Sequence, residues 1–163
     1  MSFPLPPSAL DQTLVFEFFW KFSAFECALK RHGFLNPKRS YADPNWKEFG
    51  KEIKGGFQKI HLDGFNNSVE MLKQLSPKRQ VNREGKLGWD PVEEQTAGES
   101  DEEYIIRLLQ VVRNNLFHGG KYPDGLIEEI ARDREILRAA LTVLNGCYEL
   151  HPGIKTSIDE VAA

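Results

Sequence analysis

A long stretch without a helix breaker constrains the fold most. The run LDQTLVFEFFWKFSAFECALKRHG, residues 10–33, contains no proline and reaches its first glycine only at Gly33. Apolar residues recur in it at spacings of three and four, the period of an α-helix with one buried face. They are Leu14, Phe18, Phe22, Phe25 and Leu29, with Val15 and Phe19 widening the stripe. The pattern predicts a first helix over about 11–33, opened by a capping-box-like pair, Ser8 and Asp11.

The remaining chain also reads mainly as helix. A short helix is predicted at 45–53, and longer ones at about 58–75, 100–118 and 124–150, the last ended by Pro152-Gly153. The helical pattern is lost over 76–100, where QVNREGKLGW predicts either a small hairpin turning at Glu84-Gly85 or an irregular loop. The expected fold is therefore an all-α bundle of four longer helices plus a short one, with an insertion at about 76–100.

Composition limits what such a bundle does. The 163 residues, 40% of them hydrophobic, suit one globular domain covering 1–163. A net charge of -3 is not that of a broadly basic nucleic-acid binder, so any polyanion site must be a local patch. Cys27 and Cys147 fall in two separate predicted helices and suit reduced thiols, with no metal site and no cofactor implied. With no leader and no long apolar run, we expect a cytoplasmic protein with no membrane partner.

The stretch VVRNNLFHGGK, residues 111–121, contains the end of the helix predicted at about 100–118, and its composition is unusual for a helix end. A cation and a following glycine are ordinary at a helix C-terminus. Two asparagines in succession are not explained in this way, because Asn is a mediocre helix former. The core side of this helix is expected to carry Ile105, Leu108, Leu109, Val112 and Leu116. Its polar side is expected to carry Arg107, Gln110, Asn114 and His118.

These residues resemble the R-x(4-6)-H motif of the HEPN superfamily, which consists of all-α domains. Arg113 and His118 fit its spacing, and Asn114 fits the polar residue that often follows the arginine. The segments KFSAFECALKRHGF and LSPKRQVNREGKLGW also resemble a plasmid- and defence-associated HEPN group. The likeness extends from about residue 14 to residue 150. It implies a HEPN-like fold and a metal-independent endoribonuclease that acts as a toxin or in antiviral defence.

The resemblance implies a chemical role for each motif residue. His118 would take the proton of the ribose 2′-hydroxyl, since a neutral histidine is a suitable base near pH 7. Arg113 would stabilise the charge that develops on the phosphoryl oxygens. Asn114, and less directly Asn115, would orient His118 or donate to the phosphate. The expected products carry 2′,3′-cyclic phosphate and 5′-hydroxyl ends.

Other residues are predicted to support this site. Glu26 is in line with the apolar stripe of the first helix, so it either pairs, with Arg113 as the partner that the resemblance suggests, or reaches water at the edge of the stripe. The RNA-binding candidates are Arg107, Lys121, Lys78, Arg79, Arg83 and Lys86. The last four lie in the insertion at 76–100, and the alternative is that this segment is an ordinary solvated loop with no ligand.

The angle between Arg113 and His118 around the helix is relevant to whether one chain or two form the site. Arg113 and His118 are about 140° apart on a straight helix, at 100° per residue. The arginine stem could curl over the helix end, the last turn could unwind at Gly119, or a second protomer could face the first. We expect the last arrangement, a homodimer with Phe117 as an apolar anchor. RNA is the expected partner, whether tRNA, mRNA or rRNA, together with an antitoxin.

A different class of function stays open. Some HEPN-like proteins are non-catalytic scaffolds that bind RNA, nucleotide or protein. Such members have usually lost the arginine or the histidine of the motif. Because Arg113 and His118 are both present, the sequence favours the endoribonuclease.

Overall fold

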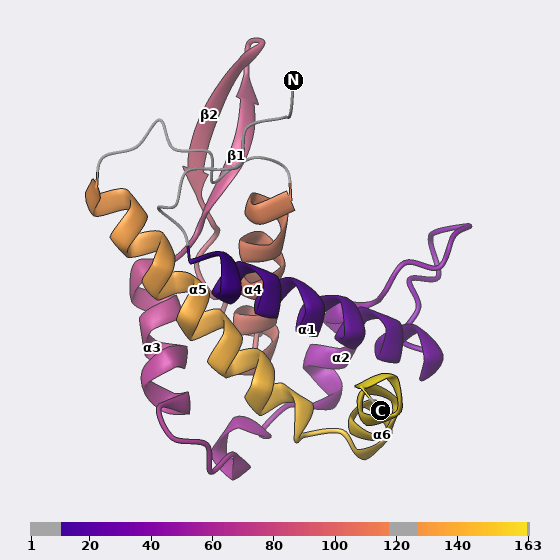
Figure 1. Ribbon diagram of the computed structural model, residues 1–163. Coiled ribbons are helices and arrows are strands. Elements are labelled where there is room, and N and C mark those ends of the chain that lie inside the picture. The colour runs from indigo at the N-terminus through magenta and orange to yellow at the C-terminus, as the bar shows by residue number, and fades with distance from the viewer. Residues whose placement is uncertain (1–10, 118–126, 163) are drawn as a thin grey trace, which may run out of the picture.

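The computed structural model describes residues 11–117 and 127–162. This part of the chain is mostly helical, with one small antiparallel hairpin (Figure 1). The helices are α1 (Gln12–Arg31), α2 (Trp46–Glu52), α3 (Phe65–Leu75), α4 (Asp101–Phe117), α5 (Ile127–Tyr148) and α6 (Pro152–Ala162), and the strands are β1 (Lys78–Arg83) and β2 (Lys86–Pro91). A single 3-10 turn at Phe57–Lys59 precedes α3.

The first helix forms as its sequence pattern predicts. Phe18, Phe22, Phe25 and Leu29 are buried, and Leu14 is partly covered at the edge of the core. The N-cap is Asp11, whose Oδ1 accepts the backbone N–H groups of Thr13 (3.0 Å) and Leu14 (3.2 Å). The other member of the predicted capping pair, Ser8, lies outside the described residues.

Two helix boundaries differ from the prediction. The helix expected at 58–75 begins only at Phe65, because Gly64 has φ 76° and this left-handed conformation interrupts the helix. Pro152 was expected to end the last helix, but it is the first residue of α6. Proline suits this position because its fixed φ is helical and its missing N–H would have no helical partner.

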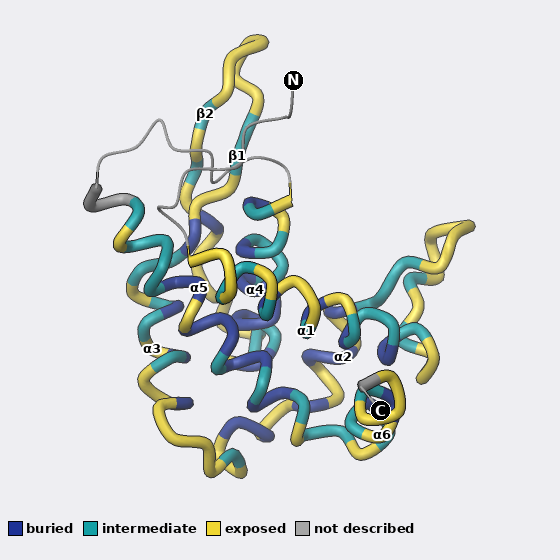
Figure 2. Tube along the Cα trace, viewed as in Figure 1, coloured by how far each residue is buried: buried dark blue, intermediate teal, exposed yellow. Residues whose placement is uncertain are grey.

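The hairpin alternative for the insertion is confirmed. Arg83 pairs with Lys86, leaving a two-residue turn at Glu84 and Gly85, which have φ 53° and 81°. Positive φ at both residues is what a type I′ turn requires. The Oδ1 of Asn82 accepts the Gly85 N–H at 2.7 Å. The hairpin extends away from the helices, and its tip is exposed (Figure 2).

The helices enclose one core. α1 packs on α5 and α6, α3 on α5, and α2 on α4. The buried side of α4 carries Ile105, Leu108, Leu109 and Val112, as the spacing predicts, while Leu116 is partly covered. Cys27 of α1 and Cys147 of α5 are free thiols. Within residues 11–117 and 127–162, no helix combines the length and the apolar character that crossing a membrane requires.

An aromatic cluster connects α1 with α2 inside this core. The ring of Phe25 stacks on Trp46 at a centroid distance of 5.3 Å and meets the edge of Phe49 at 5.3 Å. Phe22 also contacts Trp46, at 4.7 Å. This cluster fixes α2 against the C-terminal half of α1, next to the end of α4 that carries the arginine and asparagines of the motif.

Candidate functional site

An open pocket of about 390 Å³ lies where α1, α4 and the start of α2 meet. Its lining comes from these helices and from the loop that precedes α2. The residues are Phe22, Glu26, Asn36, Asp43, Pro44, Asn45, Trp46, Lys47, Gln110, Arg113 and Asn114. Three residues predicted from the sequence therefore share one pocket: Arg113, Asn114 and Glu26.

Arg113 is held in this pocket but remains partly accessible. Its Nη2 lies 3.6 Å from Oε2 of Glu26, and its Nη1 donates to Oδ1 of Asn114 at 3.0 Å. The guanidinium carbon also lies 5.1 Å from the ring centroid of Phe117 and 5.9 Å from that of Phe22. About a third of the side chain (33%) is exposed. Such a guanidinium is oriented in advance and can still reach an anionic ligand.

Glu26 connects α1 to both other helices of the pocket. Its Oε2 faces Arg113 of α4, and its Oε1 accepts the indole N–H of Trp46 at 3.2 Å. Of the two alternatives drawn from the sequence, the pairing with Arg113 is the one observed. Because the carboxylate is held from two sides, it fixes where the guanidinium points.

The two asparagines of the motif have different environments. Asn114 is exposed, and in the described part of the chain its Nδ2 has no hydrogen bond. Asn115 is buried, and its Nδ2 donates to the carbonyl oxygen of Lys78 at 2.7 Å. The prediction that Asn115 helps the chemistry disagrees with this geometry, because its amide is used to tie the start of β1 to α4.

His118 and Lys121, the predicted base and an RNA-binding candidate, lie outside the described residues, as does Gly119. The relation of His118 to Arg113 therefore stays a prediction. The structure does give the end of the described helix at Phe117, directly before His118.

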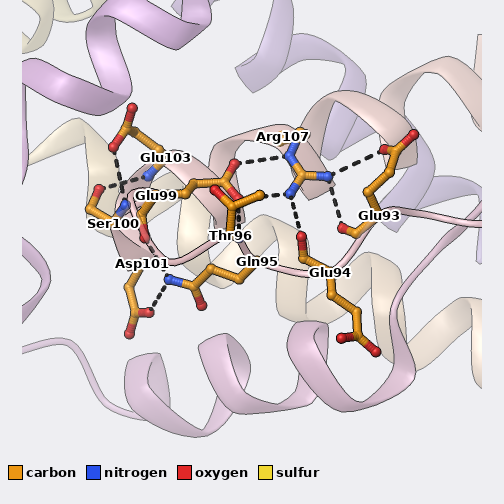
Figure 3. Close-up of polar contacts among 9 residues, drawn as sticks. All are labelled: Glu93, Glu94, Gln95, Thr96, Glu99, Ser100, Asp101, Glu103 and Arg107. Atoms are coloured by element: carbon orange, nitrogen blue, oxygen red, sulfur yellow. Dashed lines mark hydrogen bonds and ion pairs between the residues drawn. The ribbon is translucent and has the colours of Figure 1, made fainter.

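Arg107 was predicted to contact RNA, but its guanidinium holds the loop at 92–100 (Figure 3). Its Nε and Nη2 donate to the two carboxylate oxygens of Glu99 at 3.0 and 2.8 Å. Its Nη1 donates to the carbonyl oxygen of Glu93 at 2.9 Å. Since the acidic loop already occupies these donors, Arg107 is a structural clamp and its geometry does not support the predicted role.

The clamp should make the stability of this loop depend on pH. The hydrogen bond from Arg107 holds the pKa of the Glu99 carboxyl below its ordinary value. A lowered carboxylate pKa stabilises the fold above the pKa of the unfolded chain, about 4.3, and this stabilisation is lost as the pH falls further. We therefore expect Glu99→Gln to destabilise the protein at pH 7, with the difference from wild type shrinking toward pH 3. Urea unfolding at several pH values measures this.

Glu94→Gln is the control for this prediction. Glu94 is exposed in the same loop, and within the described residues its carboxylate makes no ion pair or hydrogen bond. Its substitution should leave stability nearly unchanged at every pH. A destabilisation by Glu99→Gln that is the same at pH 7 and pH 3 would contradict the clamp.

Basic side chains of the hairpin are partly neutralised. Arg79 pairs with Glu93 at 2.6 Å, and Arg83 pairs with Asp90 across the two strands. Lys78 and Lys86 are exposed and form no ion pair within the described parts of the chain. The predicted RNA-binding function of this segment therefore rests on the two lysines more than on the arginines.

The structure places Phe117 on an exposed aromatic surface. Phe117 is 45% exposed, and its ring contacts Phe19 of α1 at a centroid distance of 5.2 Å. Phe16, about one turn of α1 before Phe19, and Trp20, the residue after Phe19, are also exposed. We call these four residues, Phe16, Phe19, Trp20 and Phe117, the aromatic surface. It adjoins Arg113, whose guanidinium lies over the Phe117 ring.

Several residues of the pocket were not predicted from the sequence. Asn36, Asp43 and Asn45 lie in NPKRSYADPN, which reads only as a proline-rich connection. Gln110 was placed on the polar side of its helix without a role. The available signal was the number of amide and carboxylate side chains in this connection, and it gives no indication that they lie beside α4.

The described residues contain no group of three or more His, Cys, Asp or Glu side chains placed to hold a metal ion. Comparisons of the chain with models of protein families, with curated proteins and with solved structures found no match.

Proposed function

We propose that this chain is a metal-independent endoribonuclease of HEPN type. The observation that carries the proposal is the shared pocket of Arg113 and Asn114, in the helix that leads directly to His118. Its volume of about 390 Å³ falls within the range of about 300–1,000 Å³ common for ligand sites. The ion pair with Glu26 supports the proposal further, because a prepositioned guanidinium stabilises developing charge without reorganising.

Each residue has one task in this proposal. His118 removes the proton of a ribose 2′-hydroxyl, and the 2′-oxygen attacks the adjacent phosphorus. The bond from phosphorus to the 5′-oxygen breaks, which leaves a 2′,3′-cyclic phosphate and, after protonation, a 5′-hydroxyl. Arg113 stabilises the charge on the phosphoryl oxygens, and the Nδ2 group of Asn114 donates to the same phosphate. Glu26 orients Arg113.

The proposal includes a dimer as the working unit. The exposed aromatic surface adjoins Arg113, so burying it against a second copy would bring two motifs close together. Aromatic residues of this kind are typical anchors of protein interfaces. Two copies would also double the local positive charge available to RNA, which responds to nearby charges more than to the net charge. We place the activity in the cytoplasm, as a toxin or defence ribonuclease controlled by an antitoxin.

Growth of bacteria tests this function. Induced production of the wild-type chain should arrest growth, because unrestrained RNA cleavage stops protein synthesis. Production of His118→Ala to the same level should not, since the general base is removed. Arg138→Ala changes an exposed arginine of α5 that pairs with Glu135, away from the pocket, and should be as toxic as wild type. Equal growth with wild type and His118→Ala would instead favour a scaffold that binds without cutting.

A further inference from the structure

The loop between α1 and α2 is closed at its base by backbone contacts. Leu35 and Pro44 form an isolated antiparallel bridge, and the Asn36 N–H donates to the Asp43 carbonyl at 2.9 Å. The Asn36 side chain adds a bond, with Nδ2 donating to Oδ2 of Asp43 at 3.1 Å. These contacts hold Asp43, and with it Asn45, at the rim of the pocket that contains Arg113.

Asp43 presents acceptors to this pocket. Its Oδ2 receives Asn36, and Arg39 lies 3.9 Å away on the same oxygen. Its Oδ1 has no hydrogen-bond partner in the described part of the chain. An ionised carboxylate only accepts hydrogen bonds, and each oxygen can take more than one. Asp43 therefore offers Oδ1, together with the remaining acceptor capacity of Oδ2 beside the Asn36 amide, to a ligand with two neighbouring donors.

Asn45 presents donors beside it. Its Oδ1 accepts the Glu48 N–H at 3.1 Å as the N-cap of α2, which fixes the orientation of the amide. The Nδ2 group therefore carries the two donors, and none of the described residues accepts from it. The pocket thus combines a donor from Asn45 with two acceptors from Asp43.

We propose that this rim binds a guanine base of the RNA, which rests on the function proposed above. Guanine carries an acceptor, O6, beside two donors, the N1 and N2 hydrogens, on one edge, and these groups are the hydrogen-bond partners that the Asn45 amide and the Asp43 carboxylate need. Adenine and cytosine offer a carboxylate only one amino group, and uracil only its N3 hydrogen. Single-stranded RNA is commonly read through these base edges. Recognition here makes Asp43 a specificity-determining residue.

The same pocket connects base recognition to the reaction. Arg113 and Asn114 line it together with Asp43 and Asn45, and Lys47 adds a second cation. A guanosine held by the loop places its own phosphate within the pocket that contains Arg113. Cleavage should therefore occur next to guanosine in single-stranded RNA.

Nucleotide binding tests the inference without requiring any cleavage. Isothermal titration with 3′-GMP, 3′-AMP, 3′-CMP and 3′-UMP should show the tightest binding for 3′-GMP, by about 10-fold or more over the others, as expected for a bidentate base contact. Asp43→Asn keeps an oxygen for Asn36 but replaces one acceptor by a donor, so it should abolish this preference. Glu48→Gln, a matched change on an exposed carboxylate outside the pocket, should retain it.

The outcomes separate this inference from the proposed ribonuclease. Equal affinity for the four nucleotides, no binding at all, or a preference for 3′-GMP that survives Asp43→Asn in a folded protein would overturn the guanine site. Cleavage of RNA with no preference for guanosine would agree with the proposed ribonuclease function but would overturn the guanine site. Replacing guanosine by inosine, which lacks the N2 donor, in an oligonucleotide should reduce cleavage at that position by about 10-fold.

Discussion

Replacement of His118 by Ala is expected to reduce RNA cleavage by about 10²- to 10⁴-fold, the usual contribution of a general base. Replacement of Arg113 by Ala should cost about 10²- to 10³-fold, because it removes a positioned donor for the phosphoryl oxygens. Both variants should fold. Arg113 is partly exposed, and its ion pair with Glu26, at 3.6 Å, is expected to add no more than about 1 kcal/mol to stability.

Initial cleavage rates, measured beside circular dichroism of each variant, check this prediction. Arg138→Ala is the control for Arg113→Ala, since it removes an exposed arginine outside the pocket and should keep the wild-type rate. Full activity in either motif variant would contradict the assignment of the site. So would unfolding of both, because the residues would then be structural.

Phe25→Ala should lower the free energy of unfolding by about 3–5 kcal/mol, as is typical for deleting a buried phenyl ring. Phe25 is 1% exposed and packs between Trp46 and Phe49, so its loss leaves a cavity between α1 and α2. Trp46 in turn donates to Glu26, which means that the same change should loosen the pocket. Urea unfolding measures the loss.

Leu87→Ala is the control. Its side chain on β2 is 68% exposed and lies outside the aromatic surface, so its removal should change the free energy of unfolding by no more than about 0.5 kcal/mol. A loss below about 1 kcal/mol for Phe25→Ala, or equal losses for the two variants, would show that the aromatic cluster is not part of the core.

The helices and the hairpin could be predicted because their signals are local. The stripe through Phe18, Phe22 and Phe25 follows the helical period, and Glu84-Gly85 suits a turn with positive φ. Pro152 was misread because proline both ends helices and begins them, and sequence alone does not decide between these roles. Gly64 was recognised as an interruption but not as the start of α3.

The candidate site could be predicted only in part, because most of it depends on contacts between distant segments. The pairing of Glu26 with Arg113 was one of two alternatives, suggested by a carboxylate in an apolar stripe. Nothing local indicates that Asp43 lies in the same pocket as Arg113, or that Asn115 bonds to Lys78. The contacts of Arg107 with Glu99 could not be predicted, because a basic residue on a polar helix face has the same local sequence pattern whether it meets RNA or an acidic loop.

Incubation of the purified chain with single-stranded RNA in excess EDTA tests the central claim most directly. The account predicts cleavage by the wild-type protein, with 2′,3′-cyclic phosphate and 5′-hydroxyl ends on the fragments, and cleavage by His118→Ala that is lower by at least about 100-fold. Intact RNA in the presence of the wild-type protein, or cleavage that appears only when Mg²⁺ replaces EDTA, would contradict it.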